Sequence, residues 1–215
     1  SRINVKVKHG DETEINGQGP VITEEAINEL FAKLDTLTKE DILVLAGSIP
    51  NTLPEDIYEK ILARLESKGI RVVVDATKDL LLNVLKYHPF LIKPNNHELG
   101  EMFGTVCKTD EDIVHYAKKL QEKGAVNVLI SMAGDGAILI TEDGQNIKMG
   151  TPKGKVVNSV GAGDSMVAGF ITGYIRGGNY EEALKSGTAA GSATAFSEGL
   201  ASLEMYEKML NQISE

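Results

Sequence analysis

The sequence predicts an α/β protein in which a mainly parallel sheet is covered by helices on both faces. Short, continuous apolar runs, which are typical of strands buried on both faces, alternate with amphipathic segments of helical period. Gly, Pro and capping residues separate these segments along the chain. Strands that alternate with helices form parallel sheets, because each helix carries the chain back to the start of the next strand.

The first element is expected to be a β-hairpin over residues 2–16. In "RINVKVK", Ile3, Val5 and Val7 alternate with polar residues, so this strand should have one covered face. "HGDETEING" then offers a turn and a second short strand. An amphipathic helix follows over 22–34, and Thr23 is its expected N-cap.

The alternating region begins at residue 41. Its parallel strands are apolar runs too continuous for half-exposed strands, and they lie at 41–47, 70–76, 89–95 and 125–132. Helices are expected between them, at 53–69, 77–87, 96–104 and 110–124. Two antiparallel strands, 136–143 and 145–150, turn at Asp143–Gly144. Three helices then close the chain, at roughly 163–177, 180–197 and 202–213.

The bulk composition excludes several classes of function. The 215 residues carry a formal net charge of −9, which argues against a broad nucleic-acid surface because phosphate neutralisation needs clustered cations. A single cysteine, Cys107, excludes an intramolecular disulfide and fits a reducing compartment. No apolar run reaches the ~18 residues of a membrane span, and no charged-then-apolar leader opens the chain. We therefore expect a cytoplasmic protein without a membrane or nucleic-acid partner.

The carboxyl ends of the predicted strands are the expected place for a ligand, because open α/β sheets bind ligands there. The residues at those ends are Gly47-Ser48, Asp75, Lys93 to Asn95, and 131–136. Asp75 is interpreted first as turn chemistry and second as a residue near a nucleotide.

The stretch "NSVGAGDSMVAGF" places Gly161, Ala162 and Gly163 before Asp164 at the start of a predicted helix. Small residues at a helix start leave backbone N–H groups open to an anion, and the helix dipole is positive there. An acid beside such an anion site suits a general base in phosphoryl transfer. Structural capping by Asp164 explains the same pattern equally well. The stretch is neither a Walker A loop nor a complete G-x-G-x-x-G motif, because Met166 stands at the third Gly position.

Five segments together resemble the ribokinase-like (PfkB) carbohydrate kinases. They are "TEINGQGP", "LAGSIP", "IKPNNHELGEMFG", "ISMAGDGAILI" and "NSVGAGDSMVAGF". They occur in the family's order and spacing over the whole chain, which is more specific than any single motif. The resemblance implies a ribokinase-like fold and ATP-dependent phosphorylation of a sugar phosphate in carbohydrate metabolism. The phosphosugar branch implies conversion of fructose 1-phosphate to fructose 1,6-bisphosphate, with tagatose 6-phosphate as the alternative substrate.

The resemblance also implies roles for individual residues. Asp164 is the expected catalytic base, and the backbone N–H groups of Gly161, Ala162 and Gly163 form the expected anion hole for the γ-phosphoryl group. Asn95 and Glu98 match an N-x-x-E motif that organises Mg²⁺, largely through waters. Taken by themselves, Asn95 and Glu98 are more often a helix cap than a metal site.

Nucleotide and substrate contacts follow from the same resemblance. Lys93 is expected near the nucleotide phosphates, and the expected nucleotide-binding turn comprises Ser131, Ala133, Gly134, Asp135 and Gly136. Arg2 and Ser48 match contacts to the substrate's phosphate, for which the planar fork of Arg is well suited. Without the resemblance, Lys93 would be interpreted as solvated surface, the turn as an ordinary hairpin and Arg2 as a frayed terminus.

The chain departs from the family pattern in two places. Family members begin upstream of Ser1, so we interpret the sequence as a lid hairpin (1–16) and a nucleotide-binding α/β domain (17–215) that lack the N-terminal part of the fold. Whether such a chain is active stays open. Asn158-Ser159 stand where many members have Asp-Thr near a monovalent-cation site, so K⁺ dependence stays open too. The family's lid is often a dimer contact, which makes a homodimer through the hairpin the expected assembly.

Other classes of function remain as alternatives. The chain could be a nucleotide-binding module without catalysis, although Asp164, Asn95 and Glu98 argue against that for a parent protein. A dinucleotide-dependent oxidoreductase is the weakest alternative, because the glycine motif is incomplete. The four histidines show no ligand spacing, which argues against zinc, and Cys107 is expected to be inert.

Overall fold

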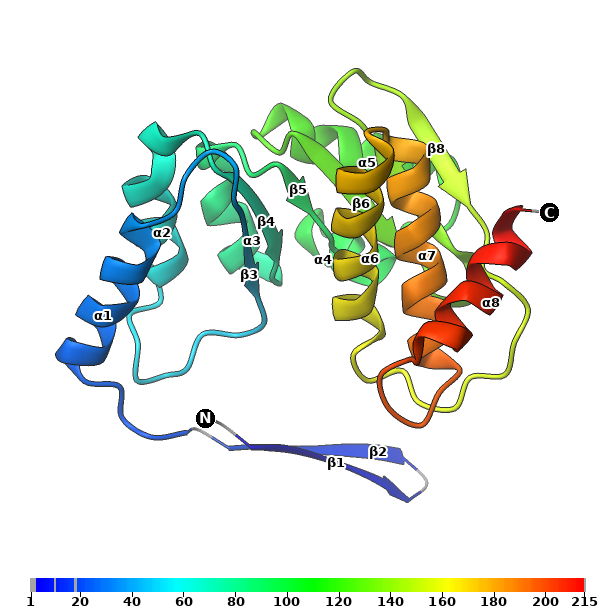
Figure 1. The fold of residues 1–215 in the computed structure, drawn as a ribbon, viewed down its shortest axis with the longest axis horizontal. Coiled ribbons are helices and arrows are strands. Elements are labelled where there is room, and N and C mark those ends of the chain that lie inside the picture. The colour runs from blue at the N-terminus through cyan, green and yellow to red at the C-terminus, as the bar shows by residue number, and fades with distance from the viewer. Residues whose placement is uncertain (1–2, 10, 18, 215) are drawn as a thin grey trace.

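A six-stranded sheet forms the body of the molecule, and a two-stranded hairpin lies apart from it (Figure 1). The structure is a computed structural model that describes residues 3–9, 11–17 and 19–214. The strand order is β3-β4-β5-β6-β7-β8, in which β3 to β6 run parallel and the last two pairs are antiparallel. The predicted mainly parallel α/β fold is confirmed.

The strands of the hairpin are β1 (Asn4–His9) and β2 (Asp11–Asn16), as the alternating pattern predicts. The strands of the main sheet are β3 (Ile42–Ala46), β4 (Arg71–Asp75), β5 (Leu91–Ile92), β6 (Asn127–Ser131), β7 (Ala137–Ile140) and β8 (Asn146–Met149). The α-helices are α1 (Glu24–Asp35), α2 (Ile57–Leu65), α3 (Lys78–Val84), α4 (Asn96–Met102), α5 (Asp110–Glu122), α6 (Ala162–Gly177), α7 (Tyr180–Ala195) and α8 (Leu203–Ser214). All lie within the predicted segments or within a few residues of them.

Local chemistry explains several of these boundaries. The Thr23 hydroxyl accepts from the Ala26 N–H at 3.3 Å, so Thr23 caps α1 as predicted. A 3₁₀ turn (Glu66–Lys68) extends α2, and Gly69 ends it in the left-handed region at φ 66°. The antiparallel turn between β7 and β8 contains Gly144 at φ 82°, a conformation that favours glycine.

Two helical layers cover the sheet, because consecutive strand residues point to opposite faces. Val72 and Val74 pack in the cluster that α1 to α5 cover, whereas Val73 packs against Phe170 of α6 on the other face. α8 packs on α7 in a smaller cluster that includes Met209. The sheet is therefore buried on both faces over its central strands.

Glycines let the backbones of α6 and α7 approach closely. A Cβ at Gly169 would lie 2.6 Å from the Ser186 carbonyl oxygen, and a Cβ at Gly187 would lie 2.9 Å from the Met166 carbonyl oxygen. Either distance is too short for a real side chain, so these positions require glycine while the helices keep this separation. The contact fixes where α6 begins relative to the sheet.

Two expectations about burial are wrong. β3 is not a fully buried strand: it is the edge strand of the sheet, and Val44 is 40% exposed because the cluster under α6 and α7 lies over β4 to β7. The apolar face of the hairpin is not covered either, since Ile3, Val5 and Ile15 are 76%, 46% and 60% exposed. The apolar patterns therefore predicted that both segments are strands, but they did not predict which parts of the protein cover them.

A buried amide at the start of β6 gives a stability prediction. Asn127 is fully buried; its Nδ2 donates to the Phe90 carbonyl (2.9 Å) and Tyr180 Oη (3.2 Å), and its Oδ1 accepts from the Glu142 N–H (2.9 Å). Asn127→Ala should lower the free energy of unfolding by about 1–3 kcal/mol, because the Glu142 N–H loses its acceptor, while the Phe90 carbonyl keeps its bond from the Asn127 N–H and Tyr180 Oη keeps its bond to Glu142. Urea denaturation measures this.

The matched control is Asn28→Ala on the exposed face of α1. Alanine is the better helix former, so this change should leave stability within about 0.5 kcal/mol or raise it slightly. An equal loss in both variants would contradict the role given to Asn127.

Candidate active site

The carboxyl ends of four parallel strands lie side by side through backbone contacts. The Gly47 N–H, just after β3, donates to the Asp75 carbonyl at the end of β4 (3.0 Å). The Lys93 N–H, just after β5, donates to the Val74 carbonyl (3.3 Å). Asn95 forms a parallel bridge with Ser131 at the end of β6. The residues that the sequence places at strand ends therefore lie together along the carboxyl ends of the parallel strands, which we call the carboxyl edge of the sheet.

A buried ion pair lies at the centre of this edge. The Lys93 ammonium is 3.2 Å from Asp75 Oδ1, and the two side chains are only 8% and 19% exposed. Burial raises the pKa of the Asp75 carboxyl above its ordinary value and outweighs the lowering by Lys93. The negative charges of Asp164 and Glu98 raise this pKa further, so both carboxylates lie within electrostatic range of Asp75.

The start of α6 meets the same ammonium. Gly161 is the N-cap residue at φ 81°, and its carbonyl accepts from the Ser165 N–H at 2.9 Å. A Cβ at Gly163 would lie 3.3 Å from Lys93 Nζ, so the absence of a side chain lets Lys93 reach the helix start. The Ala162 N–H donates to the Ser159 carbonyl (3.1 Å) and is used within the turn, although the expected anion hole includes it.

Asn95 and Glu98 form a reciprocal cap at the start of α4. Asn95 Oδ1 accepts from the Glu98 N–H and Glu98 Oε2 accepts from the Asn95 N–H, both at 2.8 Å. The interpretation of this pair as a helix cap is therefore confirmed by both hydrogen bonds of a capping box. A carboxylate has further lone pairs, so the cap leaves Glu98 able to accept more hydrogen bonds.

The surroundings of Glu98 suit a hydrated divalent cation. The negative charges of Glu98 and Asp164 act on the Asp75 carboxyl, which itself pairs with the Lys93 ammonium. An excess of negative charge with few direct ligands is what Mg²⁺ prefers, because it keeps most of its waters. Within the described ranges, no group of three or more His, Cys, Asp or Glu side chains forms a dedicated metal cage.

The turn from Ser131 to Gly136 follows β6 directly. It contains a 3₁₀ turn (Ala133–Asp135), and the Met132 N–H donates to the Gly136 carbonyl at 2.8 Å. Gly136 is at φ 92°, where a Cβ would lie 1.9 Å from the Met149 carbonyl oxygen, so only glycine fits. The Thr151 hydroxyl donates to the Gly134 carbonyl (2.8 Å) and joins the turn to the segment after β8.

Of the two residues expected to contact the substrate's phosphate, the structure describes only one. Ser48 lies on the exposed turn after Gly47, next to the end of β4. Arg2 lies outside the described residues. Sequence analysis missed Tyr58 of α2, whose hydroxyl lies 2.9 Å from the Ala46 carbonyl oxygen and 3.2 Å from that of Gly47. No sequence signal separates this tyrosine from the other apolar positions of α2.

The segment before α6 is tied to the segment after α7 through Asn158. Its Nδ2 donates to the Glu198 carbonyl (2.9 Å), and its Oδ1 accepts from the Val160 N–H (3.2 Å). The backbone N–H groups of Val157 and Asn158 both donate to the Ala195 carbonyl. These contacts hold the glycine turn against the end of α7.

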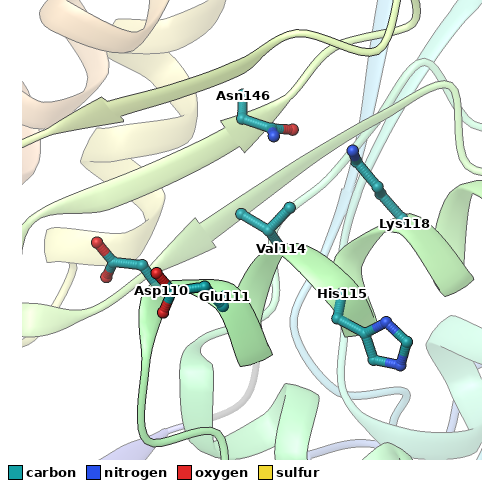
Figure 2. Close-up of a pocket in the computed structure, with 6 residues that line it drawn as sticks. All are labelled: Asp110, Glu111, Val114, His115, Lys118 and Asn146. Atoms are coloured by element: carbon teal, nitrogen blue, oxygen red, sulfur yellow. The ribbon is translucent and has the colours of Figure 1, made fainter.

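A hollow elsewhere on the surface does not belong to this site. Figure 2 shows it between α5 and β8, with a volume of about 420 Å³ and a lining that includes Asp110, His115, Lys118 and Asn146. None of the predicted site residues lines it.

In the part of the chain that the structure describes, no helix is both long and apolar enough to cross a membrane.

Comparison with known proteins agrees with the fold and with the motifs. A family model described as pfkB family carbohydrate kinase matches residues 2–205. A 1-phosphofructokinase from Bacillus subtilis is 51% identical over 213 residues, which cover 99% of this chain and 70% of that protein. A D-tagatose-1-phosphate kinase from Bacillus licheniformis is 36% identical, again over 99% of this chain and 70% of that protein.

Similarity to a solved structure extends over the same length. The crystal structure of phosphofructokinase-2 from Escherichia coli in complex with potassium has a TM-score of 0.87 and 25% identity, and covers 99% of this chain and 71% of that chain. The resemblance found in the five sequence segments is thus confirmed. On the match over residues 2–205 and the identity to these relatives, the chain belongs to the pfkB family of carbohydrate kinases.

Proposed function

We propose that this chain catalyses ATP-dependent phosphorylation of the 6-hydroxyl of fructose 1-phosphate, which gives fructose 1,6-bisphosphate. The observation that carries the proposal is the meeting of Lys93, Asp164 and the start of α6 at one edge of the sheet. The choice of sugar rests on the 51% identity to a 1-phosphofructokinase. ATP is the co-substrate that a carbohydrate kinase of this family implies.

Asp164 is the proposed general base. It would take the proton from the 6-hydroxyl as that oxygen forms a bond to the γ-phosphorus and the bond from the γ-phosphorus to the leaving ADP oxygen breaks. Its location in the first turn of α6 supports this role, because the attacked phosphoryl group would lie beside the same helix start.

Lys93 and the Gly163 backbone are the proposed stabilisers of the transferred phosphoryl group. The ammonium lies against the bare backbone of Gly163, so a positive charge and the positive end of the helix dipole converge. Asn95 and Glu98 would hold Mg²⁺ largely through waters, and this ion would neutralise part of the charge on the nucleotide phosphates. The turn from Ser131 to Gly136 is the proposed nucleotide contact.

The substrate's phosphate is proposed to contact Ser48 and Arg2. Ser48 is exposed at the carboxyl edge, two residues beyond β3, where a sugar phosphate could reach it. The alternative substrate inferred from the sequence is tagatose 6-phosphate. The relative at 36% identity is instead a kinase of D-tagatose 1-phosphate. An ADP-coupled assay with fructose 1-phosphate and both tagatose phosphates decides among them by their kcat/KM values. Mg-ATP binding by calorimetry without turnover of any of these sugars would instead favour a non-catalytic module.

The base assignment gives a prediction for turnover. Asp164→Asn keeps the shape of the side chain and removes the proton acceptor, so kcat should fall about 10²–10⁴-fold while calorimetry still detects Mg-ATP binding. The matched control is Asp143→Asn, which removes the same charge in the β7–β8 turn and should leave kcat unchanged. Retention of most activity by Asp164→Asn would refute the assignment.

The exposed hairpin face supports a homodimer through the lid, defined as residues 1–16. Ile3, Val5 and Ile15 share this face through the register that pairs Val5 with Ile15, and all three are exposed. Exposed apolar faces of this kind mark interaction sites. Phosphofructokinase-2 from Escherichia coli also forms a tetrameric inhibited state, which is a property of that relative.

A charge on this face should weaken the association. Ile15→Glu would bury a carboxylate in the proposed contact, so the apparent mass by light scattering should fall toward that of a monomer. Val106→Glu is the control, because Val106 is 69% exposed on a loop outside the lid. Equal masses for wild type and both variants, or equal losses in both variants, would remove the support for a lid-mediated dimer.

A further inference from the structure

We propose that Tyr58 is a positioning residue for the substrate side of the site, and that it acts by holding the turn that carries Ser48. The inference rests on the proposed function, because that function assigns the substrate's phosphate to Ser48. Tyr58 lies on α2, outside every motif that identified the family.

The geometry places one hydroxyl against two consecutive peptide carbonyls. Tyr58 Oη lies 2.9 Å from the Ala46 carbonyl oxygen and 3.2 Å from the Gly47 carbonyl oxygen. Ala46 is the last residue of β3, and Gly47 immediately precedes Ser48. A carbonyl oxygen only accepts, so the tyrosine donates its proton to this pair of acceptors.

The turn that Tyr58 contacts lies at the surface of the molecule. Ala46, Gly47 and Ser48 are all exposed, and a Cβ added at Gly47 would meet no atom within 4 Å. Gly47 is at φ 81°, a left-handed conformation that favours glycine, and the chain bends there. The backbone bond from the Gly47 N–H to the Asp75 carbonyl anchors one side of the turn, and Tyr58 anchors the other.

The hydroxyl stays a donor over the working pH range. Burial raises the pKa of Tyr58 above its ordinary value, and the nearby charge of Asp75 raises it further. Both causes favour the neutral phenol, which is the form that donates a hydrogen bond to the turn.

Loss of this hydroxyl should change KM for the sugar phosphate and leave KM for ATP unchanged. The proposed nucleotide residues follow β5 and β6 or begin α6, whereas the Tyr58 hydroxyl bonds the carbonyls of Ala46 at the end of β3 and of Gly47 just after it. Phenylalanine keeps the aromatic ring and its packing, so the turn loses its anchor without a cavity in the core. A looser turn weakens alignment of Ser48 with the substrate.

The experiment compares Tyr58→Phe with wild type in the full-length protein. We expect KM for fructose 1-phosphate to rise about three- to ten-fold, as for one lost hydrogen bond, while KM for ATP stays unchanged. Tyr116→Phe on α5 is the matched control, because its ring packs on Phe103 away from the strand ends, and both KM values should stay at the wild-type level. Melting temperatures show whether either variant has lost its fold.

A double-mutant cycle distinguishes positioning from a general structural effect. If Tyr58 acts through Ser48, then Tyr58→Phe should change KM for the sugar phosphate far less in a Ser48→Ala background than in wild type. Equal effects in both backgrounds, a parallel rise of KM for ATP, or no change at all would overturn the inference while leaving the proposed function in place. Absence of turnover of fructose 1-phosphate by wild type would overturn the proposed function itself, and this inference with it.

Discussion

The site depends on one buried ammonium. Lys93 is almost fully covered, and an isolated charge in that position would be strongly unfavourable. The Asp75 carboxylate compensates it, yet Asp75 is itself buried enough that its pKa is raised despite the pairing. Each group therefore depends on the other, and together they fix the distance between the ends of β4 and β5.

The position of α6 follows from a different constraint. The positive start of this helix and the Lys93 ammonium repel each other, although the Asp75 carboxylate and Asp164 in the first turn of α6 offset part of this repulsion. Close packing at Gly169 and Gly187 holds α6 against α7 whatever that local repulsion. The fold thus holds two electropositive groups close together, which is the preorganisation that the proposed phosphoryl transfer requires.

Sequence patterns predicted what is local and missed what depends on neighbours. Thr23, Gly69 and the Asp143–Gly144 turn were identifiable because caps and turns require specific residue types at specific offsets. The exposure of Val44 was not, because an apolar strand looks alike at the edge and in the centre of a sheet. Tyr58 was missed for a related reason: a tyrosine on an amphipathic helix carries no sign of the backbone atoms its hydroxyl meets.

The same distinction applies to the site. Asn95 and Glu98 were predicted both as a helix cap and as metal-organising residues, and their hydrogen bonds are those of a capping box. A cap and a hydrated cation use different lone pairs of the same carboxylate, so the structural role does not displace the chemical one. Asp75 was ranked first as turn chemistry, although its burial against Lys93 makes it a central electrostatic group. Only the contact in space between the end of β4 and the residue after β5 reveals that.

The two ends of this edge differ in how firmly they are built. Around β5 and β6 the chain is buried on both faces, and Lys93, Gly163 and the Ser131–Gly136 turn are fixed by backbone bonds and an ion pair. At the edge strand β3, Val44 and Ala46 are exposed, and the turn after this strand is at the surface, where the Gly47 N–H bonds the Asp75 carbonyl and the Tyr58 hydroxyl bonds the Ala46 carbonyl. Transfer of the same phosphoryl group demands one geometry, whereas recognition of different sugars demands variation. Under the proposed function, a nucleotide side on buried strands and a sugar side at an exposed edge strand would let substrate choice change through residues such as Tyr58 without disturbing the proposed catalytic residues.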